Sequence, residues 1–202
     1  MTTSKTHDLH YPEPRVTRFL FASKAMAPLW TILRIYLGWQ WLTSGWGKVT
    51  GGGWVGAEAG GAVRGFLGRA LTLAQGERPS VSAWYAWLIE HVFLPNAVVM
   101  SHFVAIGEVL VGLALIAGFL TGASAFFGGL MNAAFLLAGT VSSNPVMFIL
   151  ATWLVLAWRV VGYYGLDYWV LPRIGAPRGG FGGARGNRPE RVARGSEVNL
   201  TS

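Results

Sequence analysis

One carboxylate lies in the middle of an almost wholly apolar stretch. The sequence HFVAIGEVLVGLALIAGFL, residues 102–120, contains Glu108. A charge near the centre of a hydrocarbon layer costs at least about 2.5 kcal/mol, so such a residue is expected to pair with a cation or to handle protons. Two interpretations of Glu108 stay open. It is half of a structural ion pair, or it is a proton-transferring group in a buried pocket.

Further polar side chains interrupt the other apolar stretches. They are Arg34, His102, Asn132, Asn144 and Arg159. Because buried charges need partners, we expect these groups to face the interior of a helix bundle. We predict that Glu108 pairs with Arg34 or with Arg159. His102 lies near the end of its stretch, where a histidine at a membrane interface is ordinary.

The segment GWQWLTSGWGK, residues 38–48, combines tryptophans with a lysine. Trp41 and Trp46 form either an interfacial belt or a surface on which a planar ligand stacks. Lys48 closes the apolar stretch, where its long side chain can reach the interface or take part in binding. For Trp41, Trp46 and Lys48 alike, the residue types do not decide between a place at the membrane interface and a role in binding.

Several kinds of chemistry are poorly supported by the residues. The chain has no cysteine, which excludes disulfides, thiolate metal sites and CxxC redox chemistry. Its histidines, at positions 7, 10, 91 and 102, form no HxxxH pair, so no metal site is predicted. Neither a phosphate-binding glycine loop after a strand nor a GxSxG turn occurs.

The composition indicates which elements position these side chains. Of the 202 residues, 52% are hydrophobic and only 12% are charged, proportions that point to a membrane protein. A helix needs about 20 mainly apolar residues to cross a bilayer. Four segments approach that length, at 29–46, 96–120, 121–141 and 145–163. Residues spaced by four, such as Ala125, Gly129 and Ala133, allow the helices to approach closely. The predicted fold is an all-α, antiparallel four-helix membrane bundle.

The distribution of charge predicts the topology. The formal charge of +7 arises mainly from Lys and Arg residues near the two ends of the chain, with fewer in the loop at 47–95. The positive-inside rule then places both termini in the cytoplasm, in a multi-pass plasma-membrane protein. We predict no signal peptide and no nucleic-acid partner, because the basic tail suits anionic lipid.

The long loop is predicted to contain two short amphipathic helices lying on the membrane. One is AVRGFLGRALTLA, residues 62–74, and the other is SVSAWYAWLIEHVFLP, residues 80–95. In the second, a stripe is formed by Trp84, Trp87, Leu88, His91 and Val92. We divide the chain into a cytoplasmic segment at 1–27, a membrane domain at 28–172 and a disordered basic tail at 173–202.

Three segments carry a resemblance to a known family. They are LRIYLGWQWLTSGWGKVTGG, GEVLVGLALIAGFLTGASAFFGGLMNAAF and AGTVSSNPVMFILATWLVLAWRVVGYYGLDYWVLP. Together, over residues 29–172, they resemble the DoxX/DoxD family of small four-span membrane proteins. Arg34, Lys48, Glu108, Asn144 and Arg159 fall on the polar pattern of that family. The resemblance implies the bundle fold.

The family includes the large subunit of thiosulfate dehydrogenase (quinone), so the resemblance implies a thiosulfate:quinone oxidoreductase subunit. We then expect Arg34 with Lys48 to hold two thiosulfate anions, quinone to enter near Trp41 and Trp46, and Glu108 to relay a proton. The predicted catalytic residues are Glu108, Arg34 and Arg159. The predicted substrate-binding residues are Lys48, Trp41, Trp46, His102, Asn132 and Asn144.

Expected partners are the lipid bilayer, membrane quinone as electron acceptor, and a second soluble or membrane subunit. The alternative function is non-enzymatic. In that case the chain is a membrane anchor or assembly component of an oxidative-stress or redox complex, and its polar set only fixes the bundle.

Overall fold

The computed structural model describes residues 14–175, and within them the chain forms helices and turns without a strand. The prediction of an all-α fold is confirmed for this part of the chain. In order, the elements are α1 (Arg15–Ala22), η1 (Lys24–Met26), α2 (Ala27–Thr50), η2 (Gly56–Glu58), α3 (Gly61–Leu73), α4 (Ala83–Leu88), η3 (Ile89–Phe93), α5 (Ala97–Ala117), α6 (Thr121–Leu137), α7 (Asn144–Leu156), α8 (Trp158–Val161), α9 (Asp167–Val170) and η4 (Leu171–Ile174).

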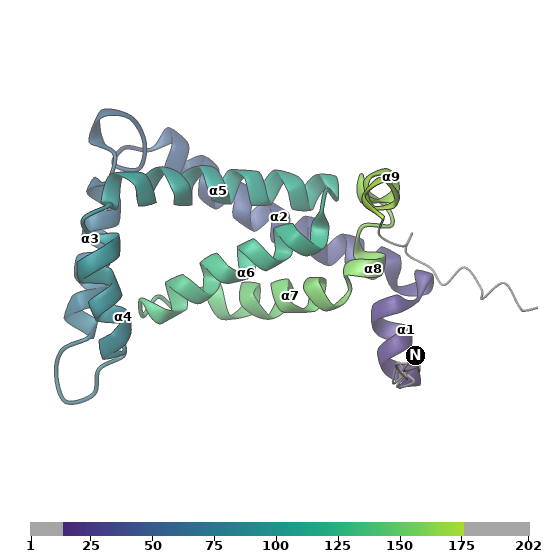
Figure 1. Ribbon diagram of the computed structural model, residues 1–202, viewed down its shortest axis with the longest axis horizontal. Coiled ribbons are helices and arrows are strands. Elements are labelled where there is room, and N and C mark those ends of the chain that lie inside the picture. The colour runs from purple at the N-terminus through teal and green to yellow at the C-terminus, as the bar shows by residue number, and fades with distance from the viewer. Residues whose placement is uncertain (1–13, 176–202) are drawn as a thin grey trace, which may run out of the picture.

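Helices α2, α5, α6 and α7 pack into a bundle. Helix α2 lies along α5, and α6 lies along α7 (Figure 1). In the same view, α3 and α4 run crosswise at one end of the bundle, while α1, α8 and α9 lie at the other. A buried cluster that includes Leu37, Trp41, Leu115 and Leu154 forms the centre.

The lengths and hydropathies of the helices support only part of the predicted membrane topology. Among residues 14–175, α5 is the one helix that is both long and apolar enough to cross a membrane. Helices α6 and α7 are apolar but shorter, with 17 and 13 residues. Helix α2 has 24 residues, and Arg34 and Lys48 are among them. Residues 14–175 therefore contain one candidate span by length and composition.

The predicted end of the fourth helix differs from the structure. The sequence predicts a continuous helix over 145–163, whereas α7 ends at Leu156 and α8 begins at Trp158. The carbonyl of Ala157 accepts hydrogen bonds from the N–H groups of Val160 and Val161, which form a new short turn.

The closest approach in the bundle is between α2 and α5, where glycines face backbone. A Cβ atom on Gly45 would lie 2.6 Å from the backbone nitrogen of Val109, and one on Gly112 would lie 2.5 Å from that of Leu42. The predicted close packing at Gly129 also occurs, since a Cβ there would lie 3.4 Å from Ala151 Cβ. The α2–α5 contact is tighter, and it fixes which residues of the two helices lie opposite each other.

The predicted loop helices are both formed. Their buried faces pack in a second cluster in which Val63 and Leu67 of α3 meet Tyr85 and Ile89. Of the stripe predicted for this segment, Leu88 packs against the cluster, whereas Trp84, Trp87, His91 and Val92 are exposed, Trp84 by 59%. The chain turns between α3 and α4 over residues 74–82.

Candidate functional site

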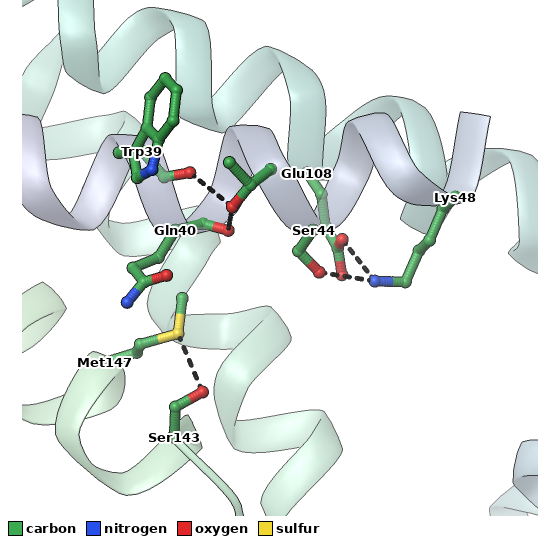
Figure 2. A network of polar contacts seen from close by, with 8 residues as sticks. Trp39, Gln40, Ser44, Lys48, Glu108, Ser143 and Met147 are labelled. Atoms are coloured by element: carbon green, nitrogen blue, oxygen red, sulfur yellow. Dashed lines mark hydrogen bonds and ion pairs between the residues drawn. The ribbon is translucent and has the colours of Figure 1, made fainter. Parts of the chain in front are cut away.

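A short ion pair joins the two closely packed helices. Lys48 Nζ of α2 lies 2.6 Å from Glu108 Oε2 of α5, and it also donates a hydrogen bond to Ser44 Oγ at 2.7 Å (Figure 2). The Glu108 side chain is only 1% exposed, whereas that of Lys48 is 19% exposed. The prediction that Glu108 pairs with Arg34 or Arg159 is therefore wrong.

The local sequence explains how this contact forms. Ser44 and Lys48 are four residues apart, which places them on one face of α2. Between them, Gly45 faces α5 so closely that a Cβ atom would lie 2.9 Å from Glu108 Cβ. The absence of a side chain at this glycine brings the carboxylate within reach of the lysine.

The ion pair borders a cavity of about 550 Å³ at the end of the bundle that α3 and α4 cap. Residues of α2, α3, α5, α6 and α7 contribute to its wall. They are Gln40, Trp41, Thr43, Ser44, Lys48, Trp54, Phe66, Glu108, Phe135, Thr140, Ser142, Ser143, Asn144 and Met147. A volume of this size is typical of small-molecule sites, and the wall combines four aromatic residues with nine polar or charged ones.

The aromatic rings surround the polar end of the cavity. The Lys48 ammonium lies 5.1 Å from the centre of the Trp54 ring, and Phe135 contacts the rings of Trp41 and Phe66. Figure 2 shows Met147 of α7, and Ser143 just before that helix, near the α2 residues of the same region. The wall therefore offers flat apolar surfaces next to one charged pair.

Two buried polar atoms of wall residues have no hydrogen-bond partner within residues 14–175. They are the second carboxylate oxygen of Glu108, Oε1, and the indole nitrogen of Trp41. Buried polar groups are normally satisfied, because an unsatisfied donor or acceptor costs about 1–3 kcal/mol. Both atoms belong to residues that line the cavity.

Arg34 belongs to a different site. It is buried, donates from Nη2 to the carbonyl of Tyr164 at 3.3 Å, and interacts electrostatically with Asp167. Fourteen helical residues separate Arg34 from Lys48, which corresponds to about 21 Å along α2. The expectation that these two cations together hold thiosulfate anions is wrong for this geometry.

The remaining predicted residues divide between the cavity and other places. Trp41 and Asn144 line the cavity, and the Asn144 amide donates to the carbonyl of Thr140. Trp46 is 61% exposed and lies outside the wall.

His102 and Asn132 lie outside the cavity wall as well. The His102 ring bonds the carbonyl of Val98, one turn earlier on α5. Asn132 is buried, and neither of its amide atoms has a partner within residues 14–175. The Arg159 guanidinium lies over the Trp158 ring at 5.7 Å.

Sequence reasoning missed two residues. Ser44 contacts the ion pair, and its four-residue spacing from Lys48 was the available signal. Asp167 is buried at the far end of the bundle and accepts a hydrogen bond from the backbone N–H of Thr121 at 2.9 Å. The sequence around Asp167, next to the GYYG segment, does not indicate that this residue contacts Thr121.

A metal centre finds no support in the part of the chain that the structure describes, where no three potential ligands gather. His7 and His10 lie outside the described residues. Searches of protein-family models, of curated proteins and of solved structures each found no match to this chain. The resemblance to the DoxX/DoxD family therefore stays a prediction.

Proposed function

We propose that the chain is a multi-pass membrane protein in which α2, α5, α6 and α7 cross the bilayer, with both termini in the cytoplasm. The supporting observation is an inverted distribution of polarity. Arg34, Glu108, Asn132 and Asp167 are buried, while large apolar side chains are exposed along the outside of the bundle. Examples of the latter are Ile32, Trp39, Phe103, Leu110, Leu113, Phe126, Leu130, Ile149 and Trp153. Lipid favours such a surface, and water does not.

The same proposal assigns a quinone-type electron acceptor to the Lys48–Glu108 cavity. The observation that carries it is the pair of unsatisfied atoms, Trp41 Nε1 and Glu108 Oε1, beside flat aromatic walls. A quinone ring stacks on aromatic side chains, and its carbonyl oxygens accept hydrogen bonds from an indole N–H or an ammonium group. Its reduced form carries hydroxyl groups that can donate to a carboxylate.

The residues suggest a division of roles during reduction. Quinone takes up two electrons and two protons to become quinol. Lys48 stabilises negative charge that develops on a carbonyl oxygen. Glu108 is ionised beside Lys48, so it first takes a proton from water and then passes it to that oxygen, and the second proton also comes from water. Because Lys48 already balances Glu108, the pocket as a whole is close to neutral, which suits a neutral quinone better than a multiply charged anion.

Thiosulfate is the electron donor that the family resemblance implies. Two thiosulfate ions form one tetrathionate ion by joining two sulfur atoms and releasing two electrons, which balances the reduction of one quinone. We assign the quinone half of this reaction to the present chain. Thiosulfate oxidation belongs to the assembled complex, including a second soluble or membrane subunit.

The test is quinone binding by the purified protein in lipid nanodiscs, together with quinone reduction by the assembled complex in isolated membranes. Thiosulfate-dependent reduction of a short-chain quinone is followed by absorbance, and binding is followed by quenching of tryptophan fluorescence. Glu108→Gln is expected to abolish turnover but retain binding, whereas Trp41→Phe weakens binding. Glu90→Gln, at an exposed carboxylate outside the cavity, is the matched control. Full turnover in a folded Glu108→Gln sample would refute the proton-transfer role.

A non-enzymatic anchor or assembly role is the second candidate, and the exposed aromatic face of α4 and η3 favours it. Trp84 and Trp87 are exposed, and the Trp87 ring stacks on His91 at 4.8 Å. Such a face is available for a partner protein. If wild-type protein binds no quinone but retains a stoichiometric partner after solubilisation, and Trp84→Ser with Trp87→Ser releases it, the anchor role replaces the enzymatic one.

A further inference from the structure

A second cavity lies at the opposite end of the bundle from the Lys48–Glu108 site. It has a volume of about 380 Å³, and residues of α6, α7, α8, α9 and η4 contribute to its wall. Its wall is formed by Leu120, Gly122, Ala123, Val155, Trp158, Asp167, Leu171 and Ile174. Ala123 and Ile174 are exposed, so the cavity opens toward the outside of the bundle. Asp167 is the one ionisable residue in this wall.

The carboxylate is held firmly, yet one of its oxygens has no partner. Asp167 is only 2% exposed. Its Oδ2 accepts a hydrogen bond from the backbone N–H of Thr121, and its own backbone N–H donates to the carbonyl of Gly118 at 2.7 Å. Oδ1 is buried and has no hydrogen-bond partner within the described chain. Arg34 Nε, Arg34 Nη1 and Thr121 Oγ1 also lack partners within the described chain. The orphaned acceptor belongs to the one polar residue in the wall of an otherwise apolar cavity, where a donor from a bound molecule would satisfy it.

Charge decides what kind of donor suits this oxygen. Arg34 lies buried beside the same junction and interacts electrostatically with Asp167. Because the guanidinium already balances the carboxylate, a cationic ligand would add an uncompensated charge to a buried site. A neutral hydroxyl donates a hydrogen bond without adding charge. The remaining wall, mainly aliphatic side chains and one tryptophan, suits a hydrocarbon chain.

We propose that this cavity binds a membrane amphiphile by its neutral hydroxyl group, which donates to Asp167 Oδ1 while the alkyl chain lies against α6 and η4. Two sources offer this chemistry, namely a lipid or fatty alcohol and a quinol. The proposal rests on the proposed membrane location, but not on quinone chemistry at the other cavity. The two sites lie at opposite ends of the bundle and can be tested separately.

The experiment uses the full chain in nanodiscs with a long-chain alcohol that carries a photoreactive diazirine in its alkyl chain. After illumination, labelled peptides are mapped by mass spectrometry. Labelling is expected in peptides that contain residues 120–123, 155–158 or 171–174. Decan-1-ol is expected to compete at a concentration roughly tenfold lower than its methyl ether, because the ether cannot donate to the carboxylate. A short-chain quinol serves as a second competitor and tells whether quinols share the site.

Two variants test the wall and the acceptor. Ala123→Phe fills the opening and is expected to remove the labelling, while Leu113→Phe, at an exposed position on α5, retains it. Asp167→Asn is expected to reduce the preference for alcohol over ether. Because this change also affects the start of α6, its thermal unfolding is measured in parallel, and Ala123→Phe carries the conclusion if Asp167→Asn unfolds.

The outcomes separate this proposal from the quinone proposal. Equal competition by alcohol and ether overturns the role of Asp167. Labelling that persists in Ala123→Phe overturns the cavity as the site. Quinone reduction at the Lys48–Glu108 cavity is expected to be unchanged in Ala123→Phe, and alcohol labelling is expected to be unchanged in Glu108→Gln. Either proposal can thus fail while the other holds.

Discussion

The Lys48–Glu108 pair is expected to respond asymmetrically to the loss of either partner. Glu108 is almost fully buried, and Lys48 is partly exposed. Lys48→Met leaves a carboxylate in the bundle with neither a cation nor solvent. Glu108→Gln leaves an ammonium group that still has Ser44 as a partner and has access to the outside of the bundle. The first variant is therefore expected to be the less stable one.

The geometry sets the scale of the effect. At 2.6 Å and an effective dielectric constant of about 20, the Coulomb attraction of two unit charges is about 6 kcal/mol before desolvation is subtracted. Breaking a buried pair by removing one partner typically costs about 3–5 kcal/mol, and we expect this range for Lys48→Met. For Glu108→Gln we expect about 1–2 kcal/mol, the scale of a lost hydrogen bond to a charged group.

A double-mutant cycle measures the coupling directly. The double variant Lys48→Met/Glu108→Gln contains no stranded charge and is expected to be about as stable as Glu108→Gln alone. The coupling free energy should then equal the single effect of Lys48→Met, about 3–5 kcal/mol, at or above the upper end of the range found for contacting residues. The assay is equilibrium unfolding in mixed micelles, followed by circular dichroism, with Glu90→Gln as a control. Additive single effects, or a larger loss in Glu108→Gln than in Lys48→Met, would refute the reasoning.

Two further predictions concern packing and titration. Gly112→Ala is expected to destabilise the bundle by about 1–3 kcal/mol, because the new methyl group meets the α2 backbone. Gly47→Ala, which meets nothing within 4 Å, is expected to be neutral or stabilising in a thermal-unfolding comparison. Burial raises the pKa of Tyr85 above its usual range, and its hydroxyl donates to the carbonyl of Ala134 at 2.8 Å. The unfolded chain then loses this proton first, so stability is expected to fall as the pH rises above about 10, and Tyr85→Phe should lessen that fall. A Tyr85→Phe variant with an unchanged pH profile would contradict this assignment.

The sequence predicted correctly those features that depend on one residue and its near neighbours, such as where a helix forms. The apolar stretch around Glu108 predicts a helix, and α5 covers its central part. The residue itself stands out because a carboxylate in such a stretch is costly. The loop helix at 62–74 was predicted from its periodicity and appears as α3.

The partner of Glu108 was decided only by tertiary packing. Arg34, Lys48 and Arg159 were all available cations, and no local pattern states which part of α2 lies opposite residue 108. Gly45 and Gly112 settle this register, because they are the points at which the two backbones can touch. With the helices in this register, Lys48 reaches Glu108.

The residues that line each cavity also could not be predicted from local sequence patterns. Phe66 and Asn144 are distant in sequence from Glu108, yet all three line one cavity. Likewise, Asp167 meets Thr121 across 46 positions of sequence at the opposite end of the bundle. The sequence by itself determined that the chain is helical, apolar outside its loops and equipped with a few costly polar groups. The tertiary structure decided how those groups divide into two sites, because each site is assembled from helices whose mutual positions depend on contacts between distant segments.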